Sequence, residues 1–194
     1  MDTDVLLKIA RLFGLIGIGL LVLSGIGGTL LASRTAQKIK WLKGKTFTYH
    51  RTTSLVGAAL FLLHPIPMVL AHDKTGLDIA SVLIPFIAPK QNLLIGLGIL
   101  AAYALIVVTI SSLYIKRLKR GTWRSLHYLT YATLFLGLAH GLFISGEFKA
   151  GETFEWEEPE KVMLLLVATT AVLFPLWRVI AVRRKIIPGA SSTR

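Results

Sequence analysis

The chain has 194 residues, of which 54% are hydrophobic and 16% charged, and its formal net charge is +12. A mean hydropathy of +0.66 excludes an ordinary soluble domain. Because the sequence contains no cysteine, it also excludes disulfide bonds, iron–sulfur clusters and any thioether-linked cofactor.

Long apolar runs poor in charge follow one another along the chain. They cover approximately residues 10–33, 48–71, 92–115, 123–145 and 161–181. Each is close to the ~20 residues that a helix needs to cross a hydrocarbon core of about 30 Å. The start of the chain is acidic and the first run is longer than a signal core, so we expect a first membrane helix there. The sequence therefore predicts an all-α integral membrane bundle of about five transmembrane helices, forming a single domain over residues 1–194.

Charged residues divide the connections between these runs into two faces. One face carries 16 of the 22 lysines and arginines: Arg34, Lys38, Lys40, Lys43, Lys45, Arg51, Lys116, Arg117, Lys119, Arg120, Arg124, Arg178, Arg183, Arg184, Lys185 and Arg194. The other face carries all ten acidic residues: Asp2, Asp4, Asp73, Asp78, Glu147, Glu152, Glu155, Glu157, Glu158 and Glu160. The positive-inside rule makes the basic face cytoplasmic, so we expect the N-terminus outside and the C-terminus inside. The net charge then reflects topology and contact with anionic membrane lipid, not nucleic acid. A bacterial inner (cytoplasmic) membrane is the expected location.

Two pairs of histidines lie within the second and fourth runs. His50 and His64 are fourteen residues apart, and His127 and His140 are thirteen apart. Either spacing corresponds to roughly 20 Å along a helix, which fits inside the hydrocarbon core. Both runs cross from inside to outside in the predicted topology, so His50 faces His127 near the inner surface and His64 faces His140 near the outer surface.

Neutral imidazole is a good axial ligand for haem iron, and four ionisable side chains at membrane depth call for a functional reason. The spacing therefore predicts two non-covalent b-type haems, with iron ligated by the pairs His50 with His127 and His64 with His140. The simpler alternative is that some of these histidines cap helices or bond to carbonyl groups within the bundle.

The angular positions of the histidines differ between the two runs. At about 100° per residue, His50 and His64 are about 40° apart around a helix, whereas His127 and His140 are about 140° apart. Either the haems lie on different sides of the fourth helix or that helix is irregular, for instance through a bulge near Gly137. In the second run, Pro65 and Pro67 predict a kink that frees a backbone carbonyl one turn earlier.

Three further features are candidates for supporting roles. Arg51 and Arg124 lie beside His50 and His127, where they could bind haem propionates or simply contribute positive-inside charge. His72 could ligate a metal or assist an outer substrate, although a solvated loop histidine is the simpler reading. The acidic segment 147–161 could dock a basic partner or collect cations, or it could be a solvated outer loop.

The segments YHRTTSLVGAALFLLHP, starting at Tyr49, and WRSLHYLTYATLFLGLAHGLF, starting at Trp123, resemble the ferric-reductase-type transmembrane domain. The resemblance covers roughly residues 45–145. Members of this family include ferric reductases, NADPH oxidases and the haem subunit of the periplasmic methionine-sulfoxide reductase system. They carry the same histidine spacings and pass electrons from the cytosolic to the outer side of the membrane.

The resemblance implies a stand-alone haem subunit. Ferric reductases and NADPH oxidases carry a flavin and nicotinamide domain after the last helix, whereas only about a dozen residues follow Val182 here. The methionine-sulfoxide-reductase haem subunit also lacks that domain, although it typically has six spans. A glycine pattern at Gly96, Gly98 and Ala101 matches part of a nucleotide fingerprint, but it lies inside an apolar run with no preceding strand, so we read it as chance.

We therefore expect a b-type dihaem membrane cytochrome with two haem b groups. It would carry electrons from a cytosolic flavoprotein or quinol to an outer acceptor, such as an outer-side reductase or a ferric compound. Such a chain is an electron-transfer subunit that requires a partner reductase, and flavin would come from that partner. The alternatives are a histidine-lined metal or proton carrier and a non-catalytic membrane anchor.

Overall fold

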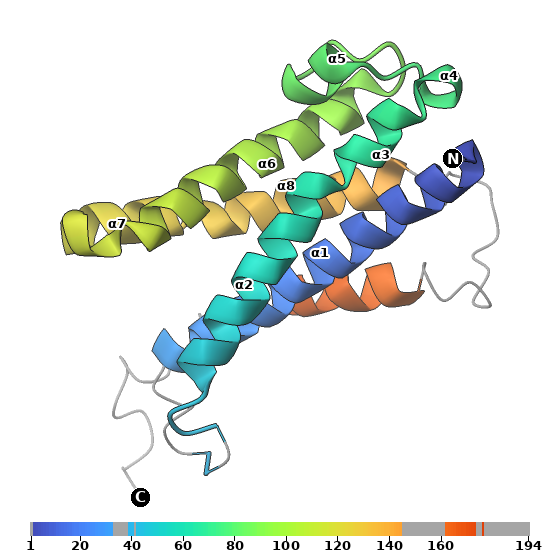
Figure 1. Cartoon of the computed structure of the whole chain (residues 1–194). Coiled ribbons are helices and arrows are strands. Elements are labelled where there is room, and N and C mark those ends of the chain that lie inside the picture. Colours follow the sequence, from blue (N-terminus) through green and yellow to red (C-terminus); the bar gives the residue numbers. More distant parts are fainter. Residues whose placement is uncertain (1, 33–38, 41, 145–161, 174–175, 177–194) are drawn as a thin grey trace, which may run out of the picture.

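The computed structural model describes residues 2–32, 39–40, 42–144, 162–173 and 176. Every regular element within those residues is a helix (Figure 1), which confirms the all-α prediction for that part of the chain. The long helices are α1 (Thr3–Ala32), α2 (Thr46–Leu63), α6 (Asn92–Leu113) and α8 (Leu129–Ile144). The shorter ones are α3 (Pro65–Leu70), α4 (His72–Thr75), α5 (Ile79–Leu83), a 3-10 turn at Ile115–Arg117, and α7 (Arg120–His127).

Three helical stretches among the described residues are long and apolar enough to cross a membrane. They are Thr3–Ala32, Thr46–Leu70 and Asn92–Leu113, and they correspond to the first three predicted runs. The fourth run is divided between α7 and α8, so neither part alone has the length of a span. In the fifth run, an apolar helix covers Val162–Leu173, and most of the remainder lies outside the described residues. The structure thus supports a membrane bundle without fixing the count at five.

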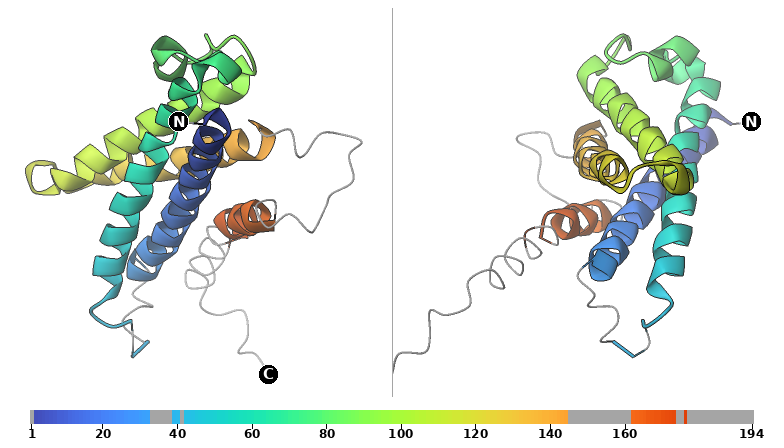
Figure 2. Two further views of the ribbon diagram at one scale, coloured as in Figure 1. Left: turned by 45° about the vertical axis from the view of Figure 1, so that its right-hand side comes forward. Right: turned by 90° about the vertical axis from the view of Figure 1, so that its left-hand side faces the viewer.

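The bundle is built from two helix hairpins. In the first hairpin α1 packs along α2, and in the second α6 packs along α8 (Figures 1 and 2). Glycines allow the close approach in the first hairpin: a Cβ atom on Gly17 would lie 2.8 Å from the backbone nitrogen of Phe61, and one on Gly57 would lie 3.0 Å from Cβ of Leu20. Small residues at such a crossing let two membrane helices come into backbone contact.

Side chains from both hairpins meet in one apolar core. The buried members are Ile18, Leu21, Ala58, Phe61, Ala101, Leu105, Leu138 and Leu164. Leu164 comes from the helix Val162–Leu173, which lies beside α1 (Figure 2). Other large apolar residues face outward, including Leu23, which is 57% exposed, and Phe135, which is 74% exposed. An apolar exterior around an apolar core is what a bilayer environment allows.

The prolines of the second run interrupt its helical hydrogen bonding at His64, as expected, while the backbone of His64 itself stays helical. Helix α2 ends at Leu63 and α3 begins at Pro65, because proline has no N–H to continue the helical hydrogen bonds.

A bulge near Gly137, one of the explanations considered for the histidine angles, is not found, since α8 runs unbroken through that residue. The fourth run is irregular nine residues earlier, at Tyr128, whose N–H donates to the carbonyls of Arg124 and Ser125. The N–H of Tyr131 then donates to the Tyr128 carbonyl over 3.1 Å. Bonds to the third residue back wind the chain more tightly than an α-helix, so the tight turn just after His127 changes the angle between His127 and His140.

Charge distinguishes the two ends of the bundle. The acidic end contains the start of α1 and the α3–α5 connection, which are joined by an ion pair between Lys74 Nζ and Asp4 Oδ1 at 2.6 Å. The hydrogen bond to Asp4 raises the pKa of Lys74. All four described acidic residues, Asp2, Asp4, Asp73 and Asp78, lie at this end, together with Lys8, Arg11, Lys74 and Lys90. The opposite, basic end contains Lys40, Lys43, Lys45, Arg51, Lys116, Arg117, Lys119, Arg120 and Arg124.

Candidate functional site

One histidine pair lies toward the basic end of the bundle. His50 on α2 and His127 at the end of α7 have ring centres 6.3 Å apart, with an angle of 72° between the ring planes. His50 Nδ1 lies 2.8 Å from the carbonyl oxygen of Ser24 and 2.9 Å from its hydroxyl. His127 Nδ1 lies 3.3 Å from the Ser112 hydroxyl. Helices α1 and α6 therefore each contribute a serine behind one of the two rings.

The second pair lies toward the acidic end. The ring centres of His64 and His140 are 6.0 Å apart, with an angle of 57° between their planes. His64 Nδ1 donates to the Phe61 carbonyl over 2.6 Å, and His140 Nδ1 donates to the Leu94 carbonyl over 2.8 Å. Both rings of this pair are thus held by backbone carbonyl groups.

These hydrogen bonds assign the tautomer of three of the four histidines. A carbonyl oxygen can only accept, so the Nδ1 atoms of His50, His64 and His140 must carry the proton. Their Nε2 atoms are then unprotonated and hold a free lone pair. Histidines that bind metals usually donate the other ring N–H to a carbonyl or carboxylate in the same manner, which fixes the ring and makes the ligand more basic.

The ring separations can be compared with what a shared metal requires. An imidazole nitrogen lies about 2 Å from a bound transition metal, so two imidazoles on opposite sides of it have ring centres about 6 Å apart. The observed distances of 6.0 and 6.3 Å match this value. The ring-centre distances are therefore those expected of two imidazoles that share one metal ion, as they do in bis-histidine haem.

Glycines of neighbouring helices make room for the rings. A Cβ atom on Gly28 would lie 3.1 Å from Cε1 of His50, and one on Gly98 would lie 2.9 Å from Nδ1 of His140. A Cβ atom on Gly96 would collide with the ring of Phe86. Packing against aromatic and imidazole rings thus explains the two glycines that resembled part of a nucleotide fingerprint.

Several residues around the pairs were missed by the sequence reasoning. The indole of Trp123 stacks on His127 with ring centres 5.0 Å apart and planes at 26°. Its Nε1 is buried and has no hydrogen-bond partner among the described residues. Trp123 precedes His127 by one helical turn, so the spacing of four could have indicated it. Ser24 and Ser112 lie on other helices, and nothing in the local sequence marks them as partners.

The remaining sequence candidates lie near the ends of the bundle. Arg51 and Arg124 are exposed at the basic end, and Arg124 Nη2 donates to the Tyr128 hydroxyl over 3.3 Å. His72 is exposed in the connection at the acidic end, where its Nδ1 donates to the Leu77 carbonyl over 3.0 Å. The acidic segment 147–161 lies outside the described residues. Within the described part of the chain, no three His, Cys, Asp or Glu side chains gather as a further metal site.

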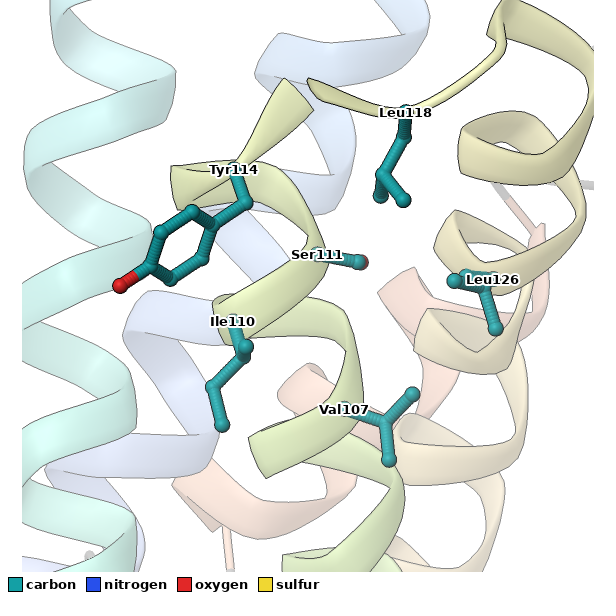
Figure 3. A pocket seen from close by; sticks show the side chains of 6 residues that line it. All are labelled: Val107, Ile110, Ser111, Tyr114, Leu118 and Leu126. Carbon is teal, nitrogen blue, oxygen red and sulfur yellow. The ribbon is translucent and has the colours of Figure 1, made fainter. Parts of the chain in front are cut away.

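An apolar pocket of about 390 Å³ opens between α6 and the start of the α7–α8 segment. Figure 3 shows its lining, which consists of Val107, Ile110, Ser111, Tyr114, Leu118 and Leu126. The Ser111 hydroxyl donates to the Val108 carbonyl over 3.0 Å, so its proton is not free to bind a polar group of a ligand. Ser111 and Leu126 are chain neighbours of Ser112 and His127, so the pocket lies at the same level along the bundle as the basic-end histidine pair.

A protein-family model described as the ferric reductase like transmembrane component matches residues 13–138. The matched region includes His50, His64 and His127 and ends two residues before His140. It begins well before the segment in which the resemblance was first seen, so it also includes most of α1. Neither the search of curated proteins nor that of solved structures found a match.

Proposed function

We propose that this chain, which belongs to the family of ferric reductase like transmembrane components, is a b-type cytochrome that carries electrons across the membrane through two haems. The observation that carries the proposal is the geometry of the two histidine pairs. Their ring centres are 6.3 and 6.0 Å apart, and three of the four Nδ1 atoms donate to backbone carbonyls, which leaves Nε2 for iron.

Each side chain then has a defined task. His50 and His127 would hold one haem near the basic end, and His64 and His140 would hold the other near the acidic end. Bound haem supplies a one-electron redox couple. The carbonyls of Ser24, Phe61 and Leu94 hold three ligand rings in orientation and increase their basicity. The apolar core between the pairs excludes water and contributes to the redox potentials.

The direction of transfer follows from the proposed topology. With the basic end in the cytosol, the chain would have five spans, its N-terminus outside and its C-terminus inside. A bacterial cytoplasmic membrane is the proposed location. Electrons would enter at the His50–His127 pair and leave at the His64–His140 pair. Fourteen residues of helix between His50 and His64 correspond to about 21 Å along the axis, so the two pairs together bridge most of the hydrocarbon core.

The electron donor would be a cytosolic flavoreductase or a quinol. The cations of the basic end would attract an acidic flavoprotein or a reduced flavin, and Arg51 and Arg124 could bind propionates of the haem beneath them. The outer acceptor would be a partner reductase or a ferric compound. The chain itself would be an electron-transfer subunit that depends on its partner reductase.

Haem analysis of the purified full chain tests this function. A pyridine haemochromogen assay should give about two haem b per chain with low-spin spectra, because both irons would have two imidazole ligands. A variant with all four histidines changed to alanine should contain none. A histidine-lined metal or proton carrier, or a simple anchor subunit, would purify without haem, and that result would exclude the cytochrome.

A further inference from the structure

The break between α2 and α3 lies at one of the proposed haem ligands. In an uninterrupted helix, the N–H of residue 65 would donate to the carbonyl of Phe61. Residue 65 is proline, so that carbonyl lacks its usual donor. The side chain of His64 takes the place of this donor, with Nδ1 at 2.6 Å from the Phe61 oxygen.

We propose that Pro65 is a positioning residue for the haem at the acidic end, because it keeps a backbone N–H from competing with the Nδ1–H of His64 for the Phe61 carbonyl. This inference rests on the proposed function of the His64–His140 pair. It concerns how His64 is oriented, whereas the proposed function concerns what it binds.

The acceptor in this arrangement is itself fixed in place. Phe61 has only 3% of its surface exposed. Its backbone packs closely on Gly17 of α1, since a Cβ atom on Gly17 would lie only 2.8 Å from the Phe61 nitrogen. The ring of Phe61 lies 5.6 Å from that of His64 and packs against Gly137 of α8. The backbone at Phe61 is therefore held by a close contact between α1 and α2, and this also fixes the position of the imidazole that donates to its carbonyl.

The chemical consequence concerns the strength of the ligand. An imidazole whose N–H donates to a carbonyl is more basic, and it stabilises the oxidised iron relative to the reduced iron. Replacing Pro65 with alanine adds a backbone N–H that competes for the Phe61 carbonyl. His64 would then share its acceptor with that N–H, so its own hydrogen bond should weaken while its place in the chain is kept.

The test compares Pro65→Ala with a matched control, Pro67→Ala. Pro67 lies in the same short helix, but its missing N–H would be directed at Leu63, not Phe61. We expect Pro65→Ala to move the midpoint potential of the acidic-end haem to a more positive value, to change its low-spin EPR signal, and to weaken its retention by roughly 10- to 100-fold. The basic-end haem should be unchanged. Pro67→Ala should leave the potential and EPR signal of both haems as in the wild type.

A second measurement uses the wild-type protein, so the test does not depend on the folding of a variant. Electron–nuclear double resonance on chain labelled with ¹⁵N-histidine should detect a proton on Nδ1 of His64 in the oxidised protein. If that proton is absent, or if the two proline variants behave alike, the role of Pro65 is refuted while the haem assignment stands. If the wild-type chain contains no haem, the proposed function itself fails.

Discussion

At the scale of single residues, the two histidine pairs are expected to act independently, because each haem would have both ligands within one pair. Changing His50 or His127 to alanine should remove one haem and leave the other. Changing His64 or His140 should remove the second. The measurement is haem content per chain, with a redox titration to identify which component is lost. A single variant that loses both haems while the protein remains folded would contradict the pairing.

Gly98 offers a sharper test of the His140 environment. A methyl group there would lie 2.9 Å from His140 Nδ1, so Gly98→Ala should push the ring away from the Leu94 carbonyl. We expect the acidic-end haem to be retained roughly 10- to 100-fold less tightly, measured by transfer of haem to an apo-protein acceptor. Gly19→Ala is the control, since the nearest atom to its added Cβ is an ordinary 3.9 Å away. Equal haem loss in both variants would argue against a specific role for Gly98.

Much of the histidine arrangement could be predicted from spacing alone, whereas the groups that orient the rings could not. Spacings of fourteen and thirteen residues place two histidines at each of two depths whenever the two helices run parallel. The structure brings together the same two pairs of rings. The hydrogen-bond partners Ser24, Ser112 and Leu94 come from helices distant in sequence, and only tertiary packing selects them. Phe61 is the exception, because Pro65 four residues later frees its carbonyl.

At the scale of helices, the pocket between α6 and α7 distinguishes two electron donors. Ile110 is 52% exposed at its wall, and Ile110→Trp should fill the pocket without disturbing the core. If a quinol is the donor and binds there, quinol should reduce the haem of this variant at least 10-fold more slowly than the haem of the wild type. Reduction through a flavoreductase should be unchanged. Ile106→Trp, one turn earlier and outside the pocket lining, serves as the control, and equal rates in both variants would exclude a quinol site here.

The positions of the helices were predictable, but the breaks within them were only partly so. Apolar runs of about 20 residues identify membrane helices because the bilayer sets their length, and α1, α2 and α6 lie where the runs were. Proline marked the break at His64 by its chemistry. The break at Tyr128 has no such signal, since it arises from a tight turn of backbone hydrogen bonds. The short helices α4 and α5 were not predicted, because they are too short to produce a clear periodic pattern.

At the scale of the whole molecule, the charge asymmetry predicts orientation. All four described acidic residues lie at the end opposite the basic connections, so the basic end should face the cytosol. Tags on the two termini should report opposite compartments, with the N-terminus outside and the C-terminus in the cytosol. Protease protection of tagged chains in oriented vesicles would measure this. Both tags on one side would mean that the chain has an even number of spans.

The same asymmetry predicts how the electron donor behaves. NADPH alone should not reduce the purified protein under anaerobic conditions, because the proposed function assigns flavin and nicotinamide chemistry to a partner. Adding a flavoreductase should allow NADPH to reduce the haems, and the change in haem absorbance measures this reduction. Its rate should fall as salt rises, since the screening length is only about 8 Å at physiological ionic strength. Rapid reduction by NADPH alone would refute dependence on a partner.

The division of the bundle into two hairpins has a consequence for assembly. The two ligands of each pair come from different hairpins: His50 and His64 from the α1–α2 side, His127 and His140 from the α6–α8 side. Direct packing is extensive within each hairpin and sparse between α2 and α8. In the proposed cytochrome, each haem would therefore fasten one hairpin to the other. Cofactor loading would then add two links to the apolar core through which the hairpins already touch.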